Sequence, residues 1–142
     1  MREILFRGKA KDSGEWVEGD LVRLNDGGKV SWYIYGKAEV DPETVGQFIG
    51  LTDRNGKRIF EGDVIKHYNR VSLGDFKSFD TGVIFWDEKK CMLRRSSAVQ
   101  SHDEDVECFV NEDSPQVWKE TARYYEVIGN IHDNPELAEV AR

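Results

Sequence analysis

Two short acidic segments carry the side chains whose type and spacing are closest to catalytic chemistry. Glu18-Gly19-Asp20 and Glu61-Gly62-Asp63 each lie between two apolar pairs, so one pattern occurs twice in the chain. Two carboxylates on either side of a cleft can act as general acid and general base, which is the chemistry of a hydrolase. The Glu-Gly-Asp pattern is also typical of a tight turn, in which glycine adopts an unusual φ and aspartate accepts a backbone N–H. The sequence offers these carboxylates no catalytic partner, so we favour the turn and keep the hydrolase as an alternative hypothesis.

Basic residues gather in one region, close to an aromatic side chain. Lys89, Lys90, Arg94 and Arg95 follow Trp86, and small barrels bind single-stranded nucleic acid with a basic groove and stacking aromatic rings. The other interpretation is a hairpin turn with the arginines on an exposed face. The whole chain has a net charge of −7, which repels a phosphate backbone. We therefore favour the hairpin and keep nucleic-acid contact at these five residues as the alternative.

The histidines and cysteines are too far apart in the sequence to predict a metal site or a nucleophile. They are His67, His102, His132, Cys91 and Cys108, and only a coincidence of the fold would bring them together. The chain has no phosphate loop, dinucleotide-binding glycine motif, zinc-binding helix motif or nucleophile elbow. We predict no cofactor, no metal and no catalytic residue, and we expect both cysteines to be free thiols in a reducing compartment.

Length and hydropathy indicate a globular protein of the cytoplasm. The 142 residues fit one domain, or one domain with a small lobe. Residues 1–7 lack the apolar run of a signal peptide, and no stretch approaches the roughly 20 apolar residues of a membrane span. Residues 103–113 contain six acidic side chains and no Lys or Arg, which predicts a solvated loop, with a docking surface for a basic partner as the alternative.

Strand signals recur along the chain, whereas helix signals are few. Residues 29–35 alternate apolar and polar side chains, the pattern of a half-buried strand. Residues 25–28 and Asn55-Gly56 predict turns, because asparagine and glycine tolerate positive φ. Pro135, just after Asn134, predicts a short helix near the end of the chain. The predicted strands are residues 3–7, 16–18, 21–24, 29–35, 45–51, 57–60, 64–68, 81–86, 91–94 and 124–131, with 106–110 as a candidate edge strand.

Residues 44–65, TVGQFIGLTDRNGKRIFEGDVI, strongly resemble the signature of the YopX-like proteins of phages and prophages. Residues 2–7 look like the start of that family and residues 125–137 like its end. The resemblance implies an SH3-like β-barrel and a molecular function that is unassigned, so no catalytic residue is carried over. Ile49 stands where Thr or an aromatic residue is expected. With the repeated acidic segment, the signature suggests structural turn positions at Gly19, Asp20, Gly50, Asn55, Gly56, Glu61, Gly62, Asp63 and Gly129.

Together these patterns predict a mainly β protein in three parts. Residues 1–40 form an N-terminal β-meander lobe, residues 41–134 an SH3-like small β-barrel with a polar insertion near 96–116, and residues 135–142 a C-terminal tail with a short helical turn. We expect a phage or prophage accessory protein of the host bacterial cytoplasm that is not an enzyme and binds a host or phage protein. We expect no membrane association, and exposed edge strands are compatible with a homodimer.

Overall fold

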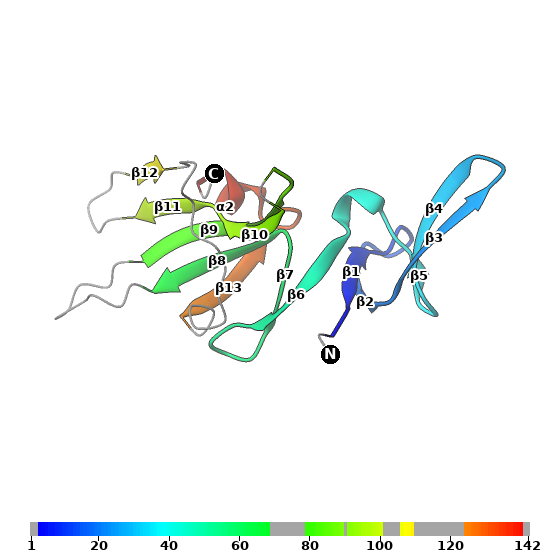
Figure 1. Ribbon diagram of the computed structural model, residues 1–142, viewed down its shortest axis with the longest axis horizontal. Helices are drawn as coiled ribbons and strands as arrows, with labels where there is room; N and C mark the ends of the chain where they lie inside the picture. The colour runs from blue at the N-terminus through cyan, green and yellow to red at the C-terminus, as the bar shows by residue number, and fades with distance from the viewer. Residues whose placement is uncertain (1–2, 69–78, 90, 101–105, 110–123, 141–142) are drawn as a thin grey trace. The chain divides into compact units, whose positions relative to one another are not determined.

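The computed structural model describes residues 3–68, 79–89, 91–100, 106–109 and 124–140. The chain is mainly β, with three antiparallel sheets and a short helix near its end (Figure 1), which confirms the predicted fold class at that level. It divides into two compact units, Met1–Gly50 and Leu51–Arg142.

The first unit contains two antiparallel arrangements of short strands. In one, β1 (Phe6–Lys9) pairs with β2 (Trp16–Gly19) on one side and with β6 (Gly46–Thr52) on the other. In the other, β3 (Leu21–Asp26), β4 (Lys29–Ile34) and β5 (Ala38–Glu39) form a meander in that order. A 3-10 turn, η1 (Pro42–Thr44), precedes β6 and is capped by the Asp41 side chain. Of the strands predicted between residues 1 and 40, β3 and β4 belong to this meander, whereas β1 and β2 belong to another sheet.

The predicted turn at residues 25–28 joins β3 to β4. Six residue pairs connect the two strands, from Leu21 opposite Ile34 to Asp26 opposite Lys29. The Asn25 side chain accepts a hydrogen bond from the backbone N–H of Gly28 at 3.1 Å, which closes the turn. Ile34 and Val40 are buried in this unit. The hairpin is therefore anchored in the core at the pair Leu21–Ile34, and its turn lies at the opposite end.

The second unit is built around a six-stranded sheet. The strand order is β12 (Val106–Phe109), β11 (Ser97–Gln100), β9 (Phe79–Asp87), β8 (Asp63–Tyr68) and β13 (Tyr125–Asn130), and β10 (Met92–Arg95) also pairs with β9. The short strand β7 (Arg58–Phe60) precedes β8, and α2 (Pro135–Val140) follows β13. Helix α2 begins where the Asn-Pro signal predicts it.

Alternation along β8, β9 and β13 gives the sheet two faces with different contents. On one side, which we call the helix face, Val64 and Val83 form a buried cluster with Ile128, Ile131 and Leu137 of α2 packed against it. On the other side, which we call the arginine face, lie the buried Ile65, Ile84 and Tyr125. The sheet is therefore covered on the helix face by a short helix, and its arginine face carries the polar cluster described below.

Among the residues described, no strand pairing joins β12 to β13, so the predicted closed barrel is not observed. Strands β12 and β13 are the two edges of the sheet. Among the described residues β12 pairs with β11, and β13 pairs with β8. The other two sheets have the strand orders β2-β1-β6-β7 and β3-β4-β5. The observed architecture is an open set of antiparallel sheets.

The predicted strands are found with boundaries shifted by a few residues, and two strands, β5 and β11, were not predicted. The first strand starts at Phe6 rather than at residue 3. Strand β11 falls in a stretch predicted as a polar insertion, whereas β12 lies at the edge of the sheet, as predicted for residues 106–110. Most of the predicted loop at 69–80 and the predicted helical turn at 118–122 lie outside the described residues.

Candidate functional site

The two arginines of the predicted basic groove point to opposite faces of the sheet. Strand β10 pairs antiparallel with β9, with Arg94 opposite Phe85 and Arg95 opposite Ile84. Because consecutive residues of a strand alternate in direction, the two side chains separate. Arg94 is buried and forms an ion pair with Asp87. The positive charge of Arg94 is therefore neutralised within the chain.

The remaining residues of that predicted groove lie near the turn between β9 and β10. Trp86 is half exposed, and it lies opposite Leu93, on the arginine face. Lys89 is exposed, and its backbone N–H donates to the Asp87 carboxylate at 3.0 Å, as in a tight turn. Lys90 lies outside the described residues. Nucleic-acid contact at these positions stays a prediction, and the geometry gives Arg94 no free charge to offer it.

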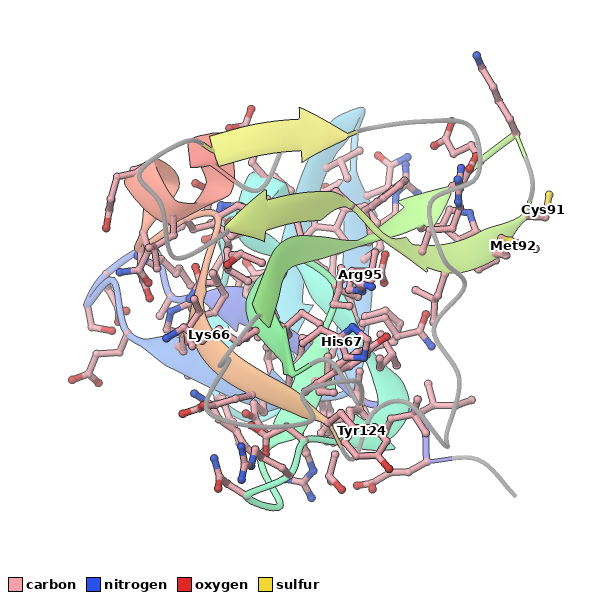
Figure 2. All side chains as sticks on the ribbon, turned by 90° about the vertical axis from the view of Figure 1, so that its left-hand side faces the viewer. Lys66, His67, Cys91, Met92, Arg95 and Tyr124 are labelled. Atoms are coloured by element: carbon pink, nitrogen blue, oxygen red, sulfur yellow. The ribbon has the colours of Figure 1, made fainter. Side chains whose placement is uncertain are left out.

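Arg95 joins a histidine and a tyrosine on the arginine face. Its Nη2 lies 3.3 Å from Nδ1 of His67, and its guanidinium carbon lies 5.9 Å from the ring centre of Tyr125. His67 and Tyr125 face each other across β8 and β13, with ring centres 5.2 Å apart and planes at 86°. We call these three residues the Arg95 cluster. Figure 2 shows Arg95 and His67 on the same side of the strands, with Lys66 on the other side.

A glycine in the middle of β9 makes room for this arginine. A Cβ atom at Gly82 would lie 2.6 Å from Cγ of Arg95 and 2.0 Å from the backbone oxygen of Ser96. Ser96 links β10 to β11, and its hydroxyl accepts the backbone N–H of Val83 at 2.8 Å. An isolated glycine in a strand often marks such a close approach. Gly82 is thus the sequence signal that would have pointed to the Arg95 cluster.

Asp53 ties the predicted Asn-Gly turn to the last strand. One carboxylate oxygen accepts the backbone N–H groups of Asn55 and Lys57, at 2.8 and 2.9 Å. The other accepts the backbone N–H of Val127 in β13 at 3.0 Å. Gly56 has a φ of 79° in this turn. Asp53 is buried and all three bonds go to backbone, which is a structural arrangement.

The repeated acidic segments differ in their surroundings. Asp63 is 1% exposed, and its carboxylate accepts the backbone N–H of Phe60 at 2.8 Å. Asp20 is exposed, and its backbone oxygen accepts the N–H of Tyr35 at 2.8 Å. The glycines have positive φ, 89° at Gly62 and 157° at Gly19. A buried carboxylate that accepts the backbone N–H of Phe60 has no access to a substrate, so this geometry gives no support to hydrolysis at Asp63.

The remaining predicted turn positions also lie at bends or close approaches. Gly50 has a φ of 87° near the end of the first unit. Gly129 follows an irregularity in the pairing of β13 with β8. A Cβ atom there would lie 2.3 Å from the side-chain oxygen of Asn134. Glu61 is half-buried beside Gly62.

The exposed face of the meander was not predicted as a site. Val22 lies opposite Tyr33 in the register, and with Leu24 and Tyr35 these residues form what we call the meander face. They line an open hollow of about 490 Å³ together with Ile34, Gly36, Lys37, Ala38 and Glu39. Leu24 is 52% exposed and Tyr35 is 74% exposed. The alternation of residues 29–35 predicts the strand, but it does not reveal that both faces carry apolar side chains.

The described part of the chain contains neither a candidate metal site nor a candidate membrane-spanning helix. There, no group of three or more His, Cys, Asp or Glu side chains is placed to hold a metal ion. Within the same residues, none of the helices combines the length and the apolar content that a membrane span requires. Cys91 is a free, exposed thiol. His102 and the side chain of Cys108 lie outside what the structure describes.

Comparison with known proteins identifies the family. A family model described as YopX protein matches residues 5–139. The chain belongs to the YopX family. The resemblance of residues 44–65 is thereby confirmed, and the match extends over both units. The crystal structure of protein EF1440 from Enterococcus faecalis is similar, with 22% sequence identity and a TM-score of 0.46, covering 96% of this chain and 99% of that one. The comparison with curated proteins found no match.

Proposed function

We propose that this member of the YopX family is a phage or prophage accessory protein that acts as a non-enzymatic protein-binding module. The meander face carries the proposal, because it gathers Leu24 and Tyr35, both largely exposed, around one hollow. Contiguous exposed apolar surface in a small protein marks an interaction site. Tyrosine suits such a site, since its ring is apolar and its hydroxyl tolerates water.

The charged residues at the rim of the hollow already have partners within the chain. Lys37 donates from Nζ to the backbone oxygen of Glu18. Glu39 forms an ion pair with Lys11 at 3.2 Å. An apolar side chain that enters the hollow therefore meets mainly carbon and buries no unpaired rim charge. This arrangement favours recognition by shape and apolar area.

The partner we infer is a protein segment in an extended conformation that carries a leucine-sized or aromatic side chain. β3 is the outer strand of its sheet, and in the described part of the chain its strand pairing is with β4. A partner strand can add to such an edge through backbone hydrogen bonds while one side chain enters the adjacent hollow. The partner is a host or phage protein in the bacterial cytoplasm, and a second copy of the chain is one outcome of the test.

The test is affinity capture from induced or infected host cells after nuclease treatment, with matched variants on the two faces of one sheet. Leu24→Ser with Tyr35→Ser removes apolar area from the meander face, whereas Val30→Ser changes an exposed residue on the opposite face of β4. We expect the double variant to lose at least ~10-fold in captured partner, which corresponds to about 1.4 kcal/mol. Equal loss in Val30→Ser, or no loss in the double variant, would contradict the proposal.

The two alternatives from the sequence receive less support. Nucleic-acid binding would use Trp86, Lys89, Lys90, Arg94 and Arg95, but Arg94 is paired with Asp87. A gel shift at low salt, where phosphate contacts are strongest, tests it directly. Hydrolysis at the acidic turns would require Asp63→Asn to abolish an activity without changing the thermal midpoint. The closed SH3-like barrel implied by the family resemblance is not found among the described strands, so neither alternative rests on it.

A further inference from the structure

The outer edge of β3 presents its backbone groups at defined positions. The N–H of Tyr35 donates to the backbone oxygen of Asp20 at 2.8 Å, so these residues form a hydrogen-bonded pair that extends the β3–β4 register. Such pairs alternate along an antiparallel ladder, so every second residue of β3 directs its N–H and C=O away from β4. Those residues are Leu21, Arg23 and Asn25. Among the described strands, none pairs with this edge (Figure 1).

Arg23, in the middle of that edge, is the one charged residue on its face of the β3–β4 hairpin. Residues directly opposite each other share a face, and this face carries Arg23, Leu21, Asn25, Val30, Trp32 and Ile34. The guanidinium carbon of Arg23 lies 5.8 Å from the ring centre of Trp32. A guanidinium held over a ring keeps its N–H donors available. Arg23 is exposed, and within the described residues its side chain forms no ion pair, so its charge is open to a partner.

The hollow of the meander face lies on the other side of the same strand. Val22 and Leu24, the two sequence neighbours of Arg23, both line it. An antiparallel strand that pairs with the outer edge of β3 places one residue directly opposite Arg23, on the face of the guanidinium. Because side chains alternate, the residues before and after that one lie opposite Val22 and Leu24, on the side of the hollow. One bound segment therefore meets apolar, charged and apolar surface in turn.

We propose that the segment recognised at the meander face has an aspartate or glutamate between two apolar residues, and that it pairs antiparallel with β3 so that the acidic residue lies opposite Arg23. Opposite charges directly across two strands stabilise the pair, whereas like charges destabilise it. A second copy of the chain, paired symmetrically about Arg23, would set two arginines against each other. The inference rests on the proposed protein binding and adds the chemistry of the partner.

The probes are synthetic peptides with a leucine–glutamate–leucine or leucine–lysine–leucine core between threonine residues. Their binding to the intact protein is measured by fluorescence anisotropy at low salt, where exposed charges are least screened. We expect the glutamate peptide to bind about 10-fold more tightly than the lysine peptide. Arg23→Glu should reverse that preference. Lys29→Glu is the matched control, because it changes the net charge equally on the same hairpin but lies opposite Asp26, and it should leave the preference unchanged.

Methylation of single peptide nitrogens tests the register. In the proposed pairing the N–H of the glutamate points to the backbone of Arg23, whereas the N–H groups of the two leucines point away from β3. Methylating the glutamate nitrogen should therefore weaken binding by about 10-fold, since it removes a ladder hydrogen bond. Methylating either leucine nitrogen should have a much smaller effect.

The outcomes separate this inference from the proposed function. Leu24→Ser with Tyr35→Ser tests the meander face itself, both in capture from host cells and with the glutamate peptide. If that double variant loses the captured partner while Arg23→Glu does not change the choice between the peptides, the acidic segment is wrong and the protein-binding function stands. Equal damage from methylation at leucine and at glutamate, or binding of neither peptide, also overturns the inference. Full binding of the captured partner by the double variant overturns the proposed function as well.

Discussion

The two Glu-Gly-Asp turns use the same three residues in opposite ways. In the second unit the aspartate is essential to the turn, since the Asp63 carboxylate is buried and accepts the backbone N–H of Phe60. In the first unit the glycine carries the constraint, because a Cβ atom at Gly19 would lie 2.8 Å from Cγ2 of the buried Ile34. A repeated sequence pattern therefore fixes a bend, but the packing around the bend decides which of its residues matters.

The largest effect is expected for Asp63→Ala. The substitution leaves the backbone N–H of Phe60 buried without its acceptor, which costs about 3 kcal/mol of unfolding free energy once lost packing is added. Asp63→Asn is the control, because its amide oxygen can still accept that hydrogen bond, and we expect about half the loss. Hydrogen exchange of the β8 and β13 amides measures the change within the second unit. An alanine variant as stable as the asparagine variant would show that the Phe60 bond is unimportant.

Gly19→Ala should come next, at about 2 kcal/mol. The new methyl group meets Cγ2 of Ile34, which is attached to a branched carbon and is enclosed by the core, so neither side can move away cheaply. Urea unfolding, with hydrogen exchange of the β3 and β4 amides, reports this loss. Combining it with Ile34→Ala should recover part of the cost in a double-mutant cycle. Strict additivity of the two substitutions would refute the steric explanation.

Gly62→Ala should cost less, about 1 kcal/mol. The methyl group would sit 3.6 Å from Cγ1 of Ile131, an ordinary contact, so only the φ of 89° is unfavourable for alanine. The same urea and exchange measurements apply. A larger loss of unfolding free energy for Gly62→Ala than for Gly19→Ala would show that backbone strain outweighs steric overlap in these turns.

The smallest effect is expected for Asp20→Ala, within about 0.5 kcal/mol of no change. Asp20 is exposed, and the hydrogen bond it makes with Tyr35 uses its backbone oxygen, which alanine retains. A thermal midpoint equal to that of the unchanged protein is the predicted result. A loss comparable to that of Asp63→Ala would show that the two turns depend on the same residue after all.

Local patterns in the sequence predict most of the fold, and contacts between distant strands account for what they miss. The alternating residues of β4, the Asn-Gly turn and Pro135 each predict their element because the signal is local. Strand β11 was missed because Ser97–Gln100 is held by its register with β9 and β12. The family resemblance implies a closed barrel. Closure depends on pairing between the edge strands of the sheet, which are far apart in the sequence.

The candidate sites were harder to predict for the same reason. Arg94 and Arg95 are adjacent in the sequence and look like one basic patch, but pairing with β9 places one beside Asp87 and the other beside His67. Nothing local links Arg95 to His67 or Tyr125. Gly82 was the available signal, since an isolated glycine inside an apolar strand suggests that another group approaches it closely.

The carboxylate of Asp53 has a consequence for the order in which the protein is made. It accepts hydrogen bonds within the turn before β7, but it also accepts one from the backbone N–H of Val127, which is 74 residues later in the sequence. During synthesis on a ribosome, the turn and β8 emerge long before the strand that completes them. Until then β8 presents an unpaired edge, so a stalled or truncated nascent chain is the form most exposed to proteases and to self-association.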